Sequence, residues 1–261
     1  MHITHHKALM DDNPAPPNSV EAVQNSLKAH ADWIEIDIHA LAADDYVINH
    51  DDTWEAGTVP LLSEIISIAA NYPNTQLQLD LKNYYPFPDD EPLERLLKLI
   101  TPIQERVVIT SPADWQLRRL RYLDSSVRVG FDPLLYFDWH APGWKHDPSR
   151  PPYTQGAYGF YDDHLLAKAS IFPPLAYVRD RCETLTHQVP GVDGLYVNFH
   201  TLIHTLQIGF DWAEMLHATG IKLTAWTVDV GNADAESAVK QLTHIDNIIT
   251  NTPKALRQLL S

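Results

Sequence analysis

The sequence predicts an α/β protein with a single domain, a TIM-type (β/α)8 barrel that spans residues 1–261. Three observations lead to this fold. Short apolar runs alternate with amphipathic segments along the chain, which is typical of a parallel sheet with crossover helices. About eight such units fit into the chain, and a closed barrel of this type needs roughly 250 residues. Several strands also alternate apolar and polar residues, so one face can meet helices while the other lines the barrel.

The expected strands are short apolar runs bounded by polar or turn-forming residues. In chain order they are His2–His6, Trp33–His39, Val47–His50, Gln76–Lys82, Val107–Thr110, Val127–Phe131, Gly194–Asn198, Lys222–Val228 and Asn247–Thr250. The expected helices are the amphipathic segments between these strands. They are Ser19–His30, Leu61–Asn71, Glu91–Ile100, Asp114–Leu123, Ala167–Thr186, Thr201–Thr219, Asp234–Leu242 and Lys254–Leu260. The first helix has a suitable cap in Asn18 or Ser19, followed by Glu21 or Gln24.

One long segment departs from this alternation. Residues 132–163 are rich in proline and aromatic side chains, and a loop of this length is uncommon inside a compact domain. Its aromatic content argues against simple disorder. Two interpretations remain open, an irregular excursion that covers one end of the barrel or a lid that faces a substrate.

Composition and charge restrict the class of protein. With 44% apolar and 20% charged residues, the chain can build a sizeable core. The formal charge of −15 argues against nucleic acid as a partner, and an anionic substrate would need a metal ion or well-placed basic residues. The single cysteine, Cys182, excludes an internal disulfide and a cysteine-rich zinc site. The first residues do not read as a signal peptide and we find no apolar run long enough for a membrane span, so we expect a cytoplasmic protein.

Polar side chains of the first, second and fourth expected strands fall on one face. Glu35 and Asp37 share the polar face of the second strand, opposite its isoleucines. By the same parity, Asp80 and Lys82 lie on the polar face of the fourth strand, and His6 on that of the first. Because helices cover the outside of a barrel, these faces point inward and meet at the active end. Antiparallel strands with one solvated face would give the same alternation and are the alternative.

Carboxylates crowded into such a site repel one another and raise one another's pKa values. A divalent cation removes this repulsion. Oxygen ligands suit Mg²⁺ or Ca²⁺ better than Zn²⁺, and Mn²⁺ is a further candidate. The sequence therefore predicts one divalent cation, held by carboxylates at the active end of the barrel.

A long composite pattern in the chain resembles the glycerophosphodiester phosphodiesterases, members of the phosphatidylinositol-phospholipase-C-like superfamily. The pattern is HHKA…PPNS…IEIDIHALAADDYVINHDDT…VPLLSEI…LQLDLK…AWTVDV…IDNIITNTP. It covers residues 3–82 and 222–253, with weaker agreement at VVITSPADWQLRRLRYLDSSVRVG. The resemblance implies a TIM-barrel enzyme that hydrolyses a small phosphodiester, releasing glycerol 3-phosphate and an alcohol with the help of a divalent cation and two histidines.

The resemblance also implies individual ligands. Glu35 and Asp37 match the family's first two metal ligands, and Asp80 stands where the family usually has a glutamate. Lys82 matches a strand-end lysine that meets the phosphate. Trp226 matches the tryptophan of the penultimate strand and is an expected substrate contact.

Of the family's two catalytic histidines, one has a single match in this sequence and the other has two candidate matches. His50 matches one of them. The other belongs to a His-Arg-Gly motif, for which two registers compete here. His6-Lys7-Ala8 keeps a basic and then a small residue, whereas a register that begins at His5 keeps neither. Strand parity also favours His6, so we predict His6 and His50 as the catalytic pair and Lys7 as a phosphate contact.

Departures from the family pattern concern the substrate more than the chemistry. Pro17 replaces the usual glutamate before Asn18, and the stretch between His50 and Asp80 lacks the capping insertion of many bacterial members. A lysophospholipase-D-like enzyme, a divergent member related to the menorin-type proteins, and a catalytically silent binding barrel remain alternatives.

An amidohydrolase-type metal hydrolase is a further alternative, because that class also begins with histidines on its first strand. It would need later ligands, for which His200 and Asp246 are the nearest candidates.

Overall fold

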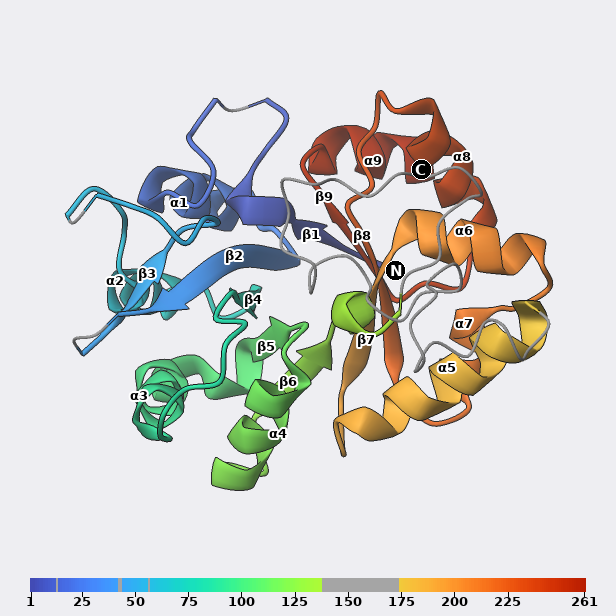
Figure 1. Ribbon diagram of the computed structural model, residues 1–261. Coiled ribbons are helices and arrows are strands. Elements are labelled where there is room, and N and C mark those ends of the chain that lie inside the picture. The colour runs from blue at the N-terminus through green and yellow to red at the C-terminus, as the bar shows by residue number, and fades with distance from the viewer. Residues whose placement is uncertain (13, 42–43, 56, 138–173) are drawn as a thin grey trace.

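The structure is a computed structural model that describes residues 1–12, 14–41, 44–55, 57–137 and 174–261. Within these ranges, eight parallel strands form a closed ring with helices around the outside (Figure 1). The order around the ring is β1, β2, β4, β5, β6, β7, β8 and β9, and β9 pairs with β1. The (β/α)8 barrel expected from the sequence is confirmed.

The strands and helices follow one another in the expected alternation. The strands are β1 (His2–His5), β2 (Trp33–Ala40), β3 (Tyr46–Ile48), β4 (Gln76–Leu81), β5 (Val107–Ser111), β6 (Arg128–Phe131), β7 (Gly194–Asn198), β8 (Lys222–Trp226) and β9 (Asn247–Thr250). The α-helices are α1 (Val20–Lys28), α2 (Leu62–Ala69), α3 (Glu91–Ile100), α4 (Asp114–Leu123), α5 (Pro174–Gln188), α6 (Phe199–Gln207), α7 (Trp212–His217), α8 (Ala233–Gln241) and α9 (Pro253–Leu260). Short 3₁₀ turns are η1 (His6–Ala8), η2 (Thr101–Arg106) and η3 (Pro133–Leu135).

Strand β3 differs from the expected role of the run at 47–50. It pairs antiparallel with the end of β2, where Ile38 lies opposite Ile48 and Ala40 opposite Tyr46. The strand is thus a short antiparallel partner of β2 and not a member of the ring. It carries the chain back toward the barrel mouth, where His50 follows it.

Most helix ends differ from expectation by a few residues, and one expected helix is divided into two. Ser19 caps α1 as expected, since its Oγ accepts a hydrogen bond from the Ala22 amide at 3.1 Å. The single helix expected at Thr201–Thr219 is instead two helices, α6 and α7. Gly209 adopts a φ of +88° between them, and Asp211 caps α7. Both are strong local signals for a helix end and a new start.

The long proline-rich segment is described only at its beginning. Residues 132–137 contain the turn η3, and residues 138–163 lie outside the described residues. The helix expected at 167–186 is described from Pro174 onward, as α5.

The two faces of the barrel strands carry different side chains. Outward-facing residues such as Ile36 and Leu79 are fully buried beneath the helices. Inward-facing residues are polar and bond across the strands, as in the hydrogen bond from Gln78 Nε2 to Thr110 Oγ1 at 3.2 Å. The inward polar face predicted from strand parity is therefore confirmed for β4.

Tyr196 of β7 occupies part of the barrel interior opposite β6. A Cβ atom at Gly130 of β6 would lie 2.2 Å from the Tyr196 ring. Glycine is required at this position because any side chain would collide with the ring.

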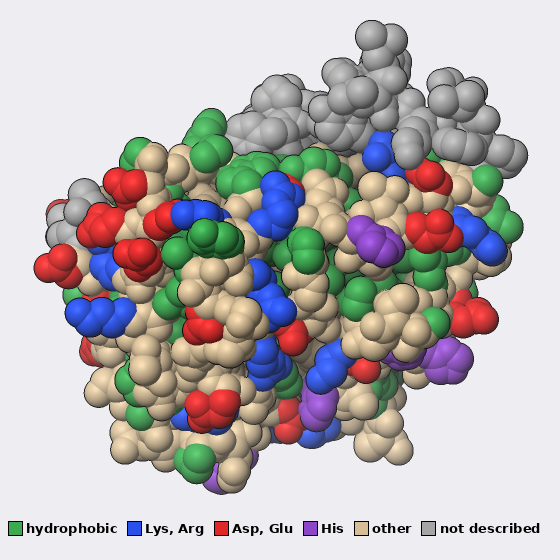
Figure 2. Space-filling view, turned by 90° about the horizontal axis from the view of Figure 1, so that it is seen from below, with side chains coloured by type: hydrophobic (Ala, Val, Ile, Leu, Met, Phe, Trp, Pro, Cys, Tyr) green, Lys and Arg blue, Asp and Glu red, His purple; other side chains and the backbone are tan. Residues whose placement is uncertain are grey.

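The outer surface has a mixed character. On the face shown in Figure 2, the described basic and acidic side chains are interspersed. Among the described residues, every helix is too short or too polar to cross a lipid bilayer.

Candidate active site

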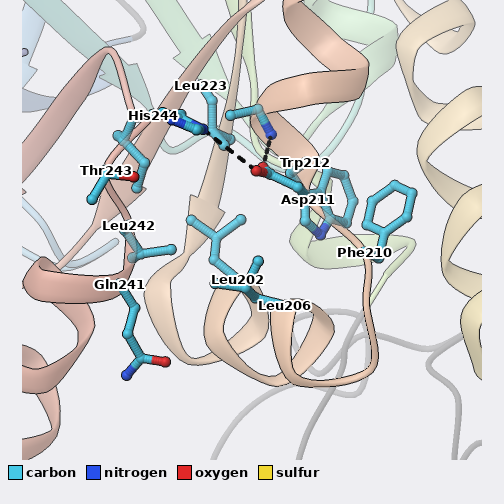
Figure 3. Close-up of a pocket in the computed structure, with 12 residues that line it drawn as sticks. Leu202, Leu206, Phe210, Asp211, Trp212, Leu223, Gln241, Leu242, Thr243 and His244 are labelled. Carbon is cyan, nitrogen blue, oxygen red and sulfur yellow. Dashed lines mark hydrogen bonds and ion pairs between the residues drawn. The ribbon is translucent and has the colours of Figure 1, made fainter.

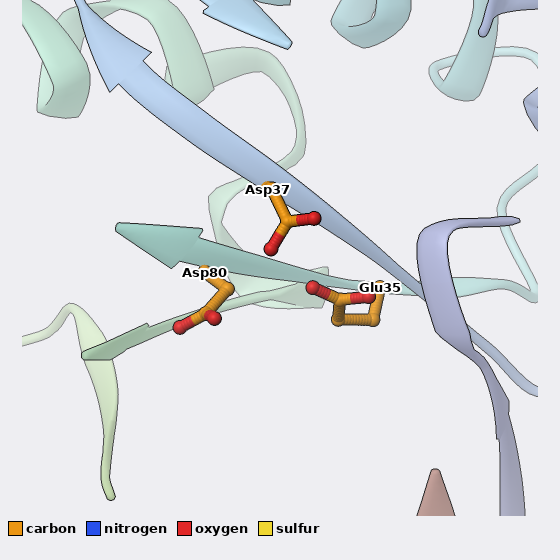
Figure 4. Close-up of side chains that lie close together, drawn as sticks. All are labelled: Glu35, Asp37 and Asp80. Atoms are coloured by element: carbon orange, nitrogen blue, oxygen red, sulfur yellow. The ribbon is translucent and has the colours of Figure 1, made fainter. Parts of the chain in front are cut away.

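Three carboxylates meet at the carboxyl ends of two neighbouring strands. Glu35 and Asp37 project from β2 and Asp80 from β4, and the register places Asp37 directly beside Asp80. One oxygen from each carboxylate lies within 4.8 Å of the others. Figure 4 shows the three side chains close together. Glu35 and Asp37 are buried and Asp80 is half-buried. The three residues predicted as metal ligands are therefore brought together.

The buried carboxylates have strongly perturbed proton affinities. Burial raises the pKa of Glu35 well above its usual value, and the negative charges of Asp37 and Asp80 raise it further. Burial acts on Asp37 in the same direction. There, however, the charge of Lys82 and a hydrogen bond from Asn18 outweigh burial and hold the pKa of Asp37 below its usual value. Adjacent acids thus differ in how readily they ionise.

Lys82 lies between two of these acids. Its Nζ is 2.5 Å from Asp80 Oδ2 and 3.0 Å from Asp37 Oδ1. Burial alone would lower the pKa of Lys82, but Asp80 and Asp37 outweigh it and raise that pKa well above the ordinary value. The ammonium group is therefore a permanent positive charge inside the cluster.

The donor set fits a hard divalent cation. All three ligands offer oxygen, the ligand type that Mg²⁺ and Ca²⁺ prefer. Asp37 Oδ1 is buried and accepts no hydrogen bond from the described residues, although it forms an ion pair with Lys82. A buried carboxylate oxygen in this state has a free lone pair for a cation.

The turn after β1 presents His6 and the backbone of Lys7 to the cluster. His6 Nε2 lies 3.9 Å from Glu35 Oε2, and the Lys7 amide donates to the same oxygen at 2.7 Å. Lys7 and Ala8 both have positive φ angles, 53° and 58°, which turn this amide inward. His5 faces the opposite way, where its Nδ1 bonds Ser26 Oγ at 2.8 Å. Of the two competing registers, the geometry brings His6 to the carboxylates and leaves His5 in the packing against α1.

Asn18 supports Asp37 from the loop before α1. Its side-chain amide donates to Asp37 Oδ2 at 2.8 Å, and its carbonyl oxygen accepts from the Asp37 amide at 3.1 Å. Its backbone amide also donates to the Lys7 carbonyl at 2.9 Å. The sequence indicated Asn18 only as a possible helix cap, so this role was missed.

His50 lies at the rim of the site, farther from the carboxylates. Its side chain is 52% exposed, and Nδ1 is 2.8 Å from Asp51 Oδ1. His39 Nε2 lies 3.4 Å from the His50 carbonyl oxygen, and the His39 ring packs near Trp54. His50 is thus beside the cluster but does not contact it.

Trp226 ends β8 on another side of the barrel mouth. It lines a small hollow together with Asp132, Phe137 and Val197, and its indole nitrogen is buried without a hydrogen-bond partner among the described residues. Asp132 is a fourth acid that the sequence did not single out. Burial and the nearby Asp80 raise the pKa of Asp132 to about 8.

A second hollow lies near the amino ends of β8 and β9, beside α6 and α7 (Figure 3). Its polar groups have structural partners. Asp211 caps α7 and lies 3.6 Å from His244 Nδ1. This hollow lies at the opposite end of the barrel from the three acids.

The comparisons with known proteins concern the fold. No protein-family model matches the sequence, and no curated protein matches it. A solved glycerophosphodiester phosphodiesterase from Parabacteroides distasonis superposes with a TM-score of 0.69 at 15% identity, covering 99% of this chain and 96% of that one. The chain has the glycerophosphodiester phosphodiesterase fold.

Two further solved structures share this glycerophosphodiester phosphodiesterase fold. A phosphodiesterase from Oleispira antarctica, solved with the product sn-glycerol-3-phosphate, has a TM-score of 0.61 at 16% identity and covers 100% of this chain and 96% of its own. A glycerophosphodiester phosphodiesterase from Thermotoga maritima has a TM-score of 0.61 at 13% identity, covering 99% of this chain and 98% of that one. The barrel fold that the sequence resemblance implied is thus confirmed for the part of the chain that the structure describes.

The residues behind the amidohydrolase-type alternative lie outside the carboxylate site. His200 is an exposed residue of α6. Asp246 precedes β9, where it accepts from the Leu223 amide at 2.8 Å and pairs with His217. Asp246 is thus at the amino ends of the strands, at the opposite end of the barrel from the three acids.

Proposed function

We propose that this chain is a metal-dependent phosphodiester hydrolase that converts a glycerophosphodiester into glycerol 3-phosphate and an alcohol. The observation that carries the proposal is the cluster of Glu35, Asp37 and Asp80, with His6 Nε2 3.9 Å from Glu35. The glycerophosphodiester phosphodiesterase fold supports the substrate class. So does the sn-glycerol-3-phosphate bound to the Oleispira antarctica neighbour.

The residues divide into a charge-binding group and a proton-transfer group. Glu35, Asp37 and Asp80 would hold one divalent cation, with Mg²⁺ or Ca²⁺ preferred and Mn²⁺ also suitable. When bound, such a cation withdraws charge from a phosphate oxygen as a Lewis acid. Lys82 and Lys7 add positive charge beside the phosphate, which stabilises the additional negative charge of the transition state.

Two histidines carry the protons of the reaction. Hydrolysis forms a bond from phosphorus to the nucleophile's oxygen and breaks the bond to the alcohol oxygen. One of His6 and His50 removes the proton from the nucleophile, and the other protonates the departing alkoxide. The alkoxide is a poor leaving group, so both transfers matter. Trp226 and the hollow beside it are suited to contact the organic part of the substrate.

Metal removal tests the proposal directly. The protein is stripped with EDTA and assayed on glycerophosphocholine, glycerophosphoethanolamine, glycerophosphoglycerol and lysophosphatidylcholine, with Mg²⁺, Mn²⁺ or Ca²⁺ restored singly. We expect activity to disappear with EDTA and return with one of these ions. Full activity in EDTA would contradict the metal assignment. No turnover of any of these diesters would indicate the catalytically silent alternative.

The same panel separates the substrate alternatives. Faster turnover of lysophosphatidylcholine than of the three glycerophosphodiesters would favour the lysophospholipase-D-like alternative over the proposed substrate class.

A further inference from the structure

We propose that Asp229 and Asn251 hold His6 in a single tautomer, with the ring proton on Nδ1 and an unprotonated Nε2 facing the carboxylates. The catalytic meaning of this inference rests on the proposed function. The hydrogen bonds that support the tautomer assignment do not depend on that function.

Three adjacent strands deliver the three residues to one place. His6 follows β1, Asn251 follows β9 and Asp229 follows β8. Asn251 donates to Asp229 twice, from the backbone amide at 2.7 Å and from side-chain Nδ2 at 2.8 Å. Asn251 Oδ1 then lies 2.8 Å from His6 Nδ1. The result is a continuous chain of hydrogen bonds from Asp229 to the histidine ring.

The direction of each hydrogen bond follows from the chemistry of its members. An ionised carboxylate can only accept, so the amide of Asn251 must turn its NH₂ group toward Asp229. Its carbonyl oxygen therefore faces His6, and a carbonyl oxygen also only accepts. The His6 Nδ1 must then be the donor. In a neutral imidazole, this leaves Nε2 with a lone pair.

A lone pair on Nε2 defines what His6 can do in the proposed reaction. Nε2 is the nitrogen nearer the carboxylates, at 3.9 Å from Glu35 Oε2. It can take a proton from the nucleophile, which makes His6 the base and leaves His50 as the acid. Asn251 and Asp229 are positioning residues, since they act only through the ring of His6.

The substitution Asp229→Asn tests the donor-to-acceptor direction of these hydrogen bonds. An asparagine at 229 can keep one oxygen for the Asn251 backbone amide and then presents NH₂ to the Asn251 side chain. The Asn251 amide then reverses and offers NH₂ to His6 Nδ1. The ring proton is expected to move to Nε2, while the shape of the site stays nearly the same.

Nitrogen NMR of the ring provides a readout that does not require activity. We would record the ¹⁵N signals of His6 at about pH 8, above the ordinary imidazole pKa, and assign them with His6→Gln. The wild type should carry its proton on Nδ1, and Asp229→Asn should carry it on Nε2. Asn251→Ala, which removes the fixed acceptor, should give a mixture of both tautomers.

Thr250→Val is the matched control. The Thr250 hydroxyl donates to Asp229 at 3.1 Å, so this variant removes one donor to the same carboxylate without touching Asn251. In this variant, His6 should keep the tautomer that it has in the wild type. A wild-type proton on Nε2, an unchanged tautomer in Asp229→Asn, or an equal shift in Thr250→Val would each overturn the inference.

Kinetics then link the tautomer to catalysis. For Asp229→Asn we expect kcat to fall by about 10²-fold or more, the contribution typical of a general base, with KM nearly unchanged. An unchanged kcat despite a reversed tautomer would overturn the role of His6 as base. If the wild type turns over no phosphodiester but shows the expected tautomer, the proposed function fails and the hydrogen-bond assignment stands.

Discussion

Lys82 can be tested as the internal counter-ion of the carboxylate cluster. The substitution Lys82→Met keeps most of the length of the side chain and removes its charge. Lys82 is only 16% exposed and contacts two acids, at 2.5 and 3.0 Å. Without it, the three acids lose the only lysine or arginine side chain that forms an ion pair with them among the described residues. We expect the free energy of unfolding in metal-free buffer to fall by about 3–5 kcal/mol, which is typical of breaking a buried ion pair.

This magnitude follows from the geometry. Two unit charges about 3 Å apart attract by roughly 5–6 kcal/mol at an effective dielectric constant near 20. Two such contacts exceed the cost of burying the ammonium, which agrees with the raised pKa of Lys82. The stabilisation is therefore fully present at neutral pH. It is lost at strongly alkaline pH, when Lys82 deprotonates, and at acid pH, when its partner acids protonate.

Urea unfolding at several pH values, with EDTA or with Mg²⁺, measures the effect. The unpaired acids of Lys82→Met acquire raised pKa values, so its folded state binds protons and its deficit should shrink as the pH falls. Mg²⁺ should also reduce the deficit, because it replaces the missing charge in the folded state only.

Lys254→Met serves as the control. Its Nζ is 2.8 Å from Asp12, but the side chain is 58% exposed, so little change in stability is expected. Equal losses of unfolding free energy in the two variants would refute the reasoning. So would a deficit of Lys82→Met that depends on neither pH nor Mg²⁺.

Three further predictions concern the same part of the barrel. His6→Ala and His50→Ala should each abolish turnover with folding intact by circular dichroism, whereas His5→Ala should retain it; loss of turnover in His5→Ala alone would reverse the choice of register. Asn18→Gly keeps the left-handed backbone (φ +57°) and removes both hydrogen bonds to Asp37. It should weaken Mg²⁺ or Mn²⁺ binding about 10–100-fold by calorimetry, while His30→Gly, at the same φ away from the site, should not. Burial, with a smaller effect of Arg257, lowers the pKa of His5 to about 4. The unfolded state then binds the additional proton, so stability should fall by about 3 kcal/mol from pH about 6.5 down to about 4. His5→Asn should flatten this part of the pH profile of stability, and an unchanged slope would contradict the assignment.

Much of the carboxylate site could be predicted from local pattern. Strand parity assigns Glu35, Asp37 and Asp80 to inward faces because side chains alternate strictly along a strand. The same parity separates His6 from His5, and the geometry places His6 beside Glu35. The catalytic role of His6 stays a prediction.

Other features depend on contacts that no local pattern contains. His6 and Asn251 are 245 positions apart, so their hydrogen bond depends on closure of the ring. Asp132 was not singled out from the sequence, because its raised pKa comes from burial and from Asp80 on another strand. The break between α6 and α7 could have been predicted, since Gly209 and Asp211 are typical helix end and start residues. One helix was expected instead because amphipathic sequence lies on both sides of the break.

The pairing of β1 with β9 has a consequence for how the protein is made. This contact joins residues 2–5 to residues 247–250, a separation that nearly spans the chain, and such contacts carry the largest loop-closure entropy during folding. During synthesis, the amino-terminal βα units can associate while β9 does not yet exist, and β1 must wait with one edge unpaired. His6 can form its hydrogen bond with Asn251 only after β1 has paired with β9. His6 would therefore be among the last groups to reach its final position, and a partly synthesised chain would hold its three acids before His6 is oriented.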